Sequence, residues 1–328
     1  MKTAFSAPGD EPHKIAILLL EQFAMIAFSS TVEPLREANW VAGRRIYEWT
    51  VVSHDGNPVR ASNGLMLEVN APIKDVDLSA IVIVCSSFNP HLYTTQPVLA
   101  WLRRQARRGA MIGGVETGAY VLALAGLLDG HRATIHWENA TSFVEEFPQV
   151  ELTNGIFEID RRRFSASGAS AAMDMMLCMI SEQAGQKIAS GVADEFVYNR
   201  IRRSEAPQRL PVADRLSTRN PRLRRLLSFL EKRLTEAIDV GEMAVVEEIS
   251  EREVQRLFRV HLGTSPKAYH RRLRLQRAQD LLRQTDLPVS EVASSCGFGS
   301  GADFSRAYRR EFARRPSDDC GVVYLLDR

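Results

Sequence analysis

Short apolar runs alternate with helical patterns over the first two hundred residues. Runs that are apolar at successive positions are typical of strands buried on both faces of a sheet. Strands are predicted at 14–20, 46–53, 79–87 and 110–115. Apolar residues with helical spacing predict helices at 30–42, 96–109, 118–128 and 168–185. Strands that alternate with helices indicate an α/β, doubly wound domain with a mostly parallel sheet covered on both faces.

The pattern changes after residue 200. A stretch rich in Pro, Arg and Ser, without a clear period, runs from 199 to 222 and predicts a linker. Short amphipathic helices without strands follow it, which indicates a second, all-α domain. We therefore expect a tail at 1–12, an α/β domain at 13–200, a linker at 201–220, an all-α domain at 221–318 and a C-terminal tail at 319–328.

The two halves of the chain differ in charge, although the net charge of the 328 residues is only +2. Residues 211–328 hold 22 Lys and Arg against 17 Asp and Glu, which leaves a net charge of −3 on residues 1–210. An acidic front and a basic back suit a sensing domain joined to a domain that binds a polyanion, although a solvated surface gives the same asymmetry.

Four cysteines, at positions 85, 178, 296 and 320, form no CxxC pair and no metal-binding spacing. They favour a reduced, cytoplasmic compartment, and we expect neither a metal nor a cofactor. The N-terminal segment lacks the apolar core of a signal peptide. The apolar runs are too short to span a bilayer, so no membrane partner is expected.

The all-α half contains an internal repeat in which 254–266 aligns with 304–316, and Arg256 falls on Arg306. Each copy follows a short helix, and a long helix joins the copies; these helices are predicted at 240–249, 289–298 and 267–285. A helix, a tight turn and an Arg-rich amphipathic helix are what reading the major groove of DNA requires. The repeat predicts two helix-turn-helix units with cores that contain Val254, Leu257, Phe258, Phe304 and Tyr308.

The segments 263–282 and 289–318 resemble the AraC/XylS family of bacterial transcription regulators. The resemblance implies sequence-specific binding to a DNA operator through two recognition helices. It places base-facing side chains at Arg252, Gln255 and Arg256 in the first unit, at Ala302, Ser305 and Arg306 in the second, and phosphate contacts at Arg309 and Arg310. Pairing of Arg306 with an acid is an open alternative. Glu248 stands where the family has a small turn residue, so the second unit is favoured as the groove binder.

The segment 113–137 has the shape of a nucleophile elbow, in which a sharp turn joins a strand to a helix. Together with 168–180 it resembles the flavodoxin-like PfpI/class I glutamine amidotransferase superfamily, over residues 14–190. A domain of this kind joined to an AraC-type domain is the layout of the GlxA-like regulators. The nucleophilic cysteine of the superfamily is replaced by Glu116, and no histidine follows it. We expect no catalysis; the alternative is a PfpI-type hydrolase or amidotransferase fused to a DNA-binding domain.

A ligand pocket is expected at the carboxyl edge of the parallel sheet. A carboxylate among aromatic rings suits an ammonium or quaternary-ammonium group, through charge and cation–π attraction. We predict a small-molecule effector, an amine or quaternary amine, bound by Glu116, Thr117, Phe23, Phe88 and Trp137. Two alternatives stay open: Glu116 caps its own helix, or the front domain serves only for dimerisation.

The GlxA-like resemblance adds an expectation about the effector. Several regulators of that kind respond to glycine betaine, carnitine or arginine, and the segment 30–39 resembles those that respond to quaternary amines. We expect a homodimer that activates transcription together with RNA polymerase, with repression as the open alternative.

Overall fold

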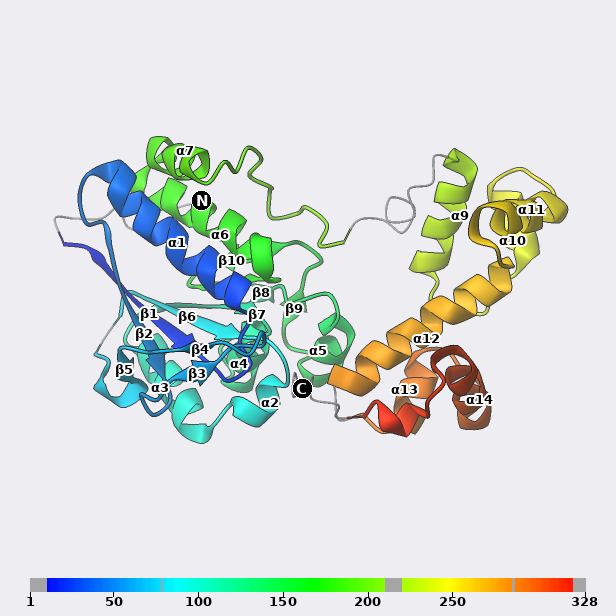
Figure 1. Cartoon of the computed structure of the whole chain (residues 1–328), viewed down its shortest axis with the longest axis horizontal. Coiled ribbons are helices and arrows are strands. Elements are labelled where there is room, and N and C mark those ends of the chain that lie inside the picture. The colour runs from blue at the N-terminus through cyan, green and yellow to red at the C-terminus, as the bar shows by residue number, and fades with distance from the viewer. Residues whose placement is uncertain (1–10, 78, 210–219, 285–286, 321–328) are drawn as a thin grey trace. The chain divides into compact units, whose positions relative to one another are not determined.

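The computed structural model describes residues 11–77, 79–209, 220–284 and 287–320. They form two compact units, one from residue 11 to 208 and one from 209 to 320 (Figure 1). Much of the expected tails and linker, namely 1–10, 210–219 and 321–328, lies outside the described residues. None of the helices in the described part of the chain is long and apolar enough to cross a membrane.

The first unit is built on a seven-stranded sheet with the order β10-β11-β7-β6-β1-β2-β5. Its strands are β1 (His13–Leu19), β2 (Tyr47–Ser53), β5 (Ala71–Pro72), β6 (Ile81–Ser86), β7 (Met111–Glu116), β10 (Phe157–Asp160) and β11 (Arg163–Ala166). All neighbouring strands are parallel except β10, which runs antiparallel to β11. The doubly wound, mostly parallel sheet that the apolar runs predict is confirmed.

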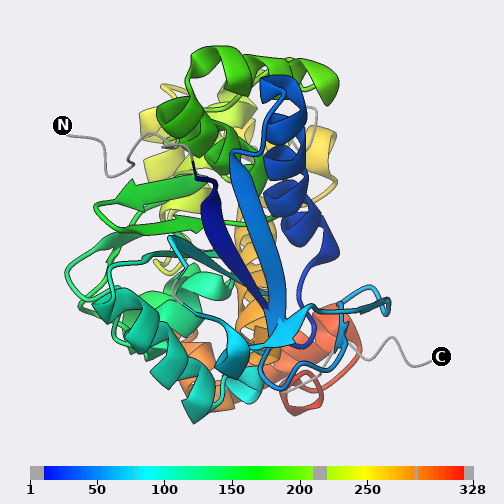
Figure 2. The same ribbon diagram turned by 90° about the vertical axis from the view of Figure 1, so that its left-hand side faces the viewer.

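Helices cover both faces of the sheet, as Figures 1 and 2 show. One layer holds α1 (Met25–Ala42), α6 (Ala169–Ala184) and α7 (Gln186–Glu195), and the other holds α3 (Gln96–Arg107), α4 (Gly118–Leu124) and α5 (Ala140–Glu146). In β1, Ile15 and Ile17 pack against the first layer, whereas Ala16 and Leu18 pack against the second. Because both faces are buried, the strand is apolar at every position and not at every second one.

Short elements occupy the connections between the main strands and helices of the first unit. They are α2 (Pro90–Tyr93), the 3-10 turn Ile73–Asp75, the pair β3 (Val59–Arg60) with β4 (Met66–Leu67), and the pair β8 (Arg132–Ala133) with β9 (Glu151–Leu152).

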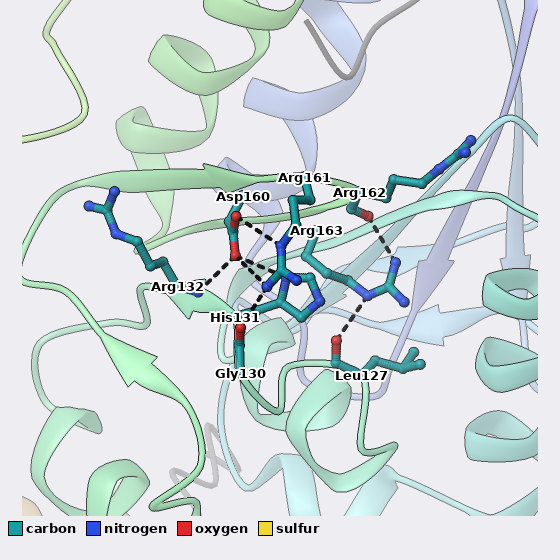
Figure 3. Close-up of polar contacts among 8 residues, drawn as sticks. All are labelled: Leu127, Gly130, His131, Arg132, Asp160, Arg161, Arg162 and Arg163. Carbon is teal, nitrogen blue, oxygen red and sulfur yellow. Dashed lines mark hydrogen bonds and ion pairs between the residues drawn. The ribbon is translucent and has the colours of Figure 1, made fainter. Parts of the chain in front are cut away.

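The β10–β11 hairpin at the edge of the sheet was not predicted. The carboxylate of Asp160, at its turn, is the centre of the polar cluster in Figure 3; it contacts the ring of His131, the backbone N–H of Arg132 and the guanidinium of Arg161. Arg163 donates to the carbonyl oxygen of Leu127 at 2.9 Å. The cluster lies at the amino end of β11, whereas Glu116 lies at the carboxyl ends of the strands. Its contacts hold the hairpin against the segment 127–132.

Residues 201–208 are bound to the first unit, although their composition predicts a linker. Asp174, fully buried on α6, forms an ion pair with Arg202 at 2.6 Å. The Nε2 of Gln208 donates to the carbonyl oxygens of Ile135 and Gly155 at 3.0 and 2.9 Å. A buried carboxylate without a partner is strongly destabilising, so Arg202 keeps this segment on the domain.

The second unit is helical and has two separate cores. Its elements are α9 (Pro221–Lys232), α10 (Val240–Val246), α11 (Glu251–Leu262), α12 (Pro266–Gln284), α13 (Val289–Ser295), α14 (Gly301–Phe312) and the 3-10 turn Pro316–Asp318. The long helix α12 joins the cores, because Tyr269 near its start packs in the first and Leu281 near its end packs in the second. The two helix-turn-helix units, α10–α11 and α13–α14, are confirmed. All five predicted core residues are buried: Val254, Leu257, Phe258, Phe304 and Tyr308.

Candidate functional sites

Three glycines build the elbow at the end of β7. A Cβ at Gly113 would overlap the ring of Phe164 on β11. A Cβ at Gly114 would overlap the backbone of Gly118, and one at Gly118 would overlap the carbonyl oxygen of Val84. These glycines therefore let α4 approach the sheet backbone to backbone, which lifts the elbow residue above the strand ends.

Glu116 is the elbow residue and has a φ of 59°, a conformation that side-chain-bearing residues rarely adopt. Its carboxylate lies against Gly168, where a Cβ would overlap it, and accepts a hydrogen bond from the backbone N–H of Ala169. Ala169 is the first residue of α6. The carboxylate of Glu116 therefore lies at the start of the neighbouring helix α6.

Burial raises the pKa of Glu116 from its ordinary 4.5 to about 7. The hydrogen bond from Ala169 lowers this pKa, and the negative charge of Glu138 raises it further. Near neutral pH the carboxyl group is therefore partly protonated. A cation held beside it would favour the ionised form and displace the proton.

Two of the side chains predicted to bind a ligand are internal. Thr117 is buried, and its hydroxyl donates to the carbonyl oxygen of Ser87 at 2.5 Å. Phe23 is fully buried and packs edge to face on Phe28 at 5.8 Å between ring centroids. Both side chains support the elbow region from inside the fold.

The other two predicted side chains, Phe88 and Trp137, are half-buried. Ser86 pairs with Glu116 between β6 and β7, so Phe88 follows at the same edge of the sheet. Trp137 precedes Glu138, whose charge acts on Glu116. Phe88 therefore follows β6 at the edge that holds Glu116, and Glu138 lies near enough for its charge to raise the pKa of Glu116.

Sequence reasoning missed Glu138 and Gly168. Glu138 was detectable as an acid beside a predicted aromatic, and its Oε2 lies 3.7 Å from the Nδ1 of His136. Gly168 carries no local signal, since its contact with Glu116 joins segments that are far apart in the sequence.

The cysteines of the first unit are poor candidates for a nucleophile. Cys85 lies on β6 beside the elbow strand and is 1% exposed, and burial raises the pKa of its thiol far above the ordinary value. Burial also raises the pKa of Cys178 to about 11. A thiol that stays protonated is a weak nucleophile. Among the described residues, no group of three or more His, Cys, Asp or Glu side chains is placed to hold a metal ion.

The turns of the two helix-turn-helix units follow the same backbone path. In each unit the backbone N–H after the turn residue donates to the alanine that packs the two helices: Ile249 to Ala244 at 3.0 Å and Phe298 to Ala293 at 2.9 Å. The turn residue itself has a positive φ, 53° at Glu248 and 74° at Gly297. Glycine adopts this conformation without strain, whereas Glu248 adopts it with strain.

The eight side chains predicted to contact DNA lie on the outer sides of α11 and α14. Six are exposed and two are half-buried: Arg252, Arg256, Ala302, Arg306, Arg309 and Arg310 in the first group, Gln255 and Ser305 in the second. Matched positions of the repeat have matched burial, because the same helical face packs on each core. All eight side chains are therefore accessible on the outer face of the second helix of each helix-turn-helix unit.

Each unit pairs its central arginine with an acid one turn earlier. Arg256 donates two hydrogen bonds of 2.7 Å to Glu253, and Arg306 pairs with Asp303. The pairing of Arg306 with an acid, which the sequence left open, is confirmed, whereas the pair of Arg256 with Glu253 was not foreseen. The pattern Ser-x-x-acid-x-x-Arg recurs in both copies of the repeat. Exposed pairs of this spacing are weak, so neither arginine is held firmly by its acid.

Contacts from α12 and from the segment before α10 hold the turn of the second helix-turn-helix unit, α13–α14, in place. Arg274 on α12 donates to the carbonyl oxygen of Cys296 at 2.6 Å, and its guanidinium lies 4.7 Å from the ring centroid of Phe298. The carbonyl oxygen of Thr235, which precedes α10, lies so close to Gly297 that a Cβ there would overlap it. The spacing of the two recognition helices is therefore fixed by packing as well as by α12.

Comparisons with known proteins cover both units. The DJ-1/PfpI family model matches residues 13–182, and a helix-turn-helix domain model matches residues 243–319. The HTH-type transcriptional regulator GbdR of Pseudomonas aeruginosa is 41% identical over 94% of this chain and 84% of its own length. The HTH-type transcriptional regulator GlxA of Rhizobium meliloti is 36% identical over 95% of this chain and 97% of its own length. A crystal structure of an AraC family transcriptional regulator from Pseudomonas putida aligns with a TM-score of 0.53 and 30% identity, over 56% of this chain and 100% of that one. Both resemblances inferred from the sequence are confirmed.

Proposed function

Since the chain belongs to the DJ-1/PfpI family and to the HTH-type transcriptional regulators, which bind DNA, we propose that it responds to a small amine or quaternary-amine metabolite. The observation that carries the proposal is the carboxylate of Glu116 at the elbow. This is the position where the fold exposes a reactive group in related enzymes. The ionised form of this carboxyl group, which a bound cation favours, selects cations over anions.

Three features around Glu116 support a cationic ligand. Glu138 adds a second carboxyl group whose charge reaches Glu116. Phe88, which follows β6, and Trp137, which precedes Glu138, are both half-buried, and aromatic faces attract ammonium groups. Binding of a cation relieves the electrostatic penalty of holding Glu116 ionised in a desolvated place.

Calorimetry with glycine betaine, carnitine, dimethylglycine and arginine tests this proposal. Glu116→Gln keeps the size of the side chain and removes its charge, so we expect affinity for the bound member to fall by about 1–3 kcal/mol. The exposed Glu68→Gln is the matched control and should bind as the wild type does. Unchanged affinity in Glu116→Gln, or a preference for anionic ligands, would contradict the proposal.

We also propose that the first unit is not an enzyme. A carboxylate at the elbow is a much weaker nucleophile than a thiolate, and Thr117, which follows it, is buried and bonded to Ser87. We expect no esterase, amidase or peptidase turnover, and none in Glu116→Cys. A turnover that disappears in Glu116→Ala would instead favour the hydrolase alternative.

For the DNA interface we propose that Gln255 and Arg256 read bases and that Arg310 holds phosphate. Gln255→Ala or Arg256→Ala should cost about 1–3 kcal/mol on the specific operator and much less on random DNA. Arg310→Ala should weaken binding to both kinds of DNA alike. Equal behaviour of the two classes would contradict this orientation of the helices.

We propose that the regulator acts as a homodimer and activates transcription together with RNA polymerase. A dimer would present four helix-turn-helix units to an operator with repeated half-sites. Sedimentation of the full chain at micromolar concentration tests the assembly, and a monomer on and off DNA would contradict it.

A further inference from the structure

A groove of about 1050 Å³ lies between the connecting helix α12 and the recognition helix α14. It is lined by side chains of both helices, by the turn around Gly297 and by Ile238 from the segment before α10. It therefore lies between the two helix-turn-helix units, which share one compact part of the chain. None of the eight DNA contacts predicted from the sequence was placed on α12.

Positive charge dominates the lining of this interunit groove. Its six cationic side chains are Lys267, Arg271, Arg272, Arg274, Arg306 and Arg310, and its acids are Asp303 and Glu311. These cationic side chains repel one another, because charges in a cleft are screened less than charges on an open surface. A bound anion would relieve this repulsion.

Some of these cations already have partners. Arg306 pairs with Asp303, and Arg272 lies 3.8 Å from Glu311. Arg274 is bound to the carbonyl oxygen of Cys296, so its role is to position the turn.

The other three cationic side chains of the groove are Lys267, Arg271 and Arg310. All three are exposed, and none forms an ion pair with any residue that the structure describes. Two come from α12 and one from α14, so the free charges face the groove from both of its walls.

Helix ends add to the positive potential of the groove. α12 begins at Pro266, one residue before Lys267, and α14 begins at Gly301, two residues before Asp303. Both helices are long enough for a full N-terminal dipole, which is equivalent to about half a positive charge. Lys267, in the first turn of α12, lines the groove, so the positive end of that helix adds to the potential there.

The position of the groove identifies the anion. Arg306 and Arg310 belong both to its lining and to the outer side of the recognition helix, so the groove continues onto the surface that faces DNA. The duplex segment between two successive major-groove contacts presents a run of phosphates to whatever lies between the recognition helices.

We propose that the interunit groove binds the DNA phosphate backbone between the two major-groove segments, and that Lys267 and Arg271 are phosphate-binding residues. The inference rests on the proposed orientation of the recognition helices. It adds a third contact region to the DNA interface, one that depends little on base sequence.

Fluorescence anisotropy of the full chain with a labelled random-sequence duplex tests the inference. Titrations between 50 and 200 mM salt give the slope of log affinity against log salt concentration. The magnitude of this negative slope decreases by about 0.9 for each phosphate contact removed. The double variant Lys267→Ala/Arg271→Ala should reduce the magnitude of this slope by about 1.8. It should also weaken binding at low salt by at least tenfold. The control Lys232→Ala removes an exposed lysine of α9 outside the groove and should leave both quantities unchanged.

The outcomes separate this inference from the DNA-binding function. A wild-type slope in the double variant, with circular dichroism matching the wild type, overturns the inference and leaves the function standing. A wild type that does not bind duplex DNA at 50 mM salt overturns both. If inorganic phosphate raises the melting temperature of the wild type but not of the double variant while the slope is unchanged, the groove is a small-anion site and the inference is wrong.

Discussion

Replacing Glu116 by Gln is expected to stabilise the first unit at alkaline pH. Burial raises the pKa of this carboxyl group to about 7 in the folded protein, against 4.5 for an exposed one. The folded state therefore holds the proton more tightly than the unfolded state, and the free energy of unfolding falls as the pH rises from 4.5 to 7. A difference of about 2.5 pH units, at 1.36 kcal/mol per unit, amounts to about 3 kcal/mol.

Glutamine removes this dependence, because it cannot ionise and still offers an oxygen to the N–H of Ala169. The stability advantage of the variant should therefore grow by about 2–3 kcal/mol between pH 5 and pH 8. Ligand-free protein is required, since a bound cation would stabilise the ionised wild type.

Urea unfolding of the full chain, followed by tryptophan fluorescence at pH 5, 6, 7 and 8, measures this difference. All four tryptophans, at positions 40, 49, 101 and 137, lie in the first unit, so the signal reports that unit alone. Glu68→Gln, an exposed site on the same unit, should differ from the wild type by the same amount at every pH. A difference for Glu116→Gln that does not change with pH, or a variant less stable than the wild type at pH 8, would refute the reasoning.

Three further substitutions concern the stability of the second unit, residues 209–320. Gly297→Ala should destabilise this unit by about 3 kcal/mol or more, because the added Cβ would overlap the carbonyl oxygen of Thr235 at a residue with a positive φ. Glu248→Gly should stabilise the unit by about 1 kcal/mol, because glycine adopts the positive φ of this turn without strain. Thermal unfolding followed by circular dichroism checks both, and shifts of the same sign would contradict the shared turn geometry. Asp319→Ala removes a fully buried carboxylate that binds Arg283 at 2.9 Å and should cost about 3–5 kcal/mol. The same unfolding experiment would contradict this prediction if the loss were below about 0.5 kcal/mol, the range of an ordinary surface change.

Elements with a strong local pattern could be predicted from the sequence. β1 and β6 are apolar at successive positions because both faces are buried, and the repeat fixed the two helix-turn-helix units. The β10–β11 hairpin was missed because three arginines, 161–163, interrupt its apolar pattern. Its stability comes from long-range contacts, such as Phe164 over the space left by Gly113.

The candidate site was predictable only in part, because much of it depends on contacts between segments that are far apart in the sequence. The elbow motif located Glu116, since strand, turn and helix are adjacent in the sequence. Its surroundings depend on the packing of distant segments, so the contact with Gly168 could not be foreseen, and Glu138, although visible as an acid, could not be linked to Glu116. Asp319 was placed in a C-terminal tail by its polar neighbours, yet it is fully buried and paired with Arg283.

The central claim is that a cation bound at Glu116 controls DNA binding by the second unit. The most direct measurement is anisotropy of the full chain on its operator, with and without the amine that calorimetry identifies, for the wild type and Glu116→Gln. We expect the amine to change the operator affinity of the wild type. At the same concentration it should leave Glu116→Gln unaffected, and without ligand the two proteins should bind the operator equally. An equal response of both proteins to the amine would contradict the claim.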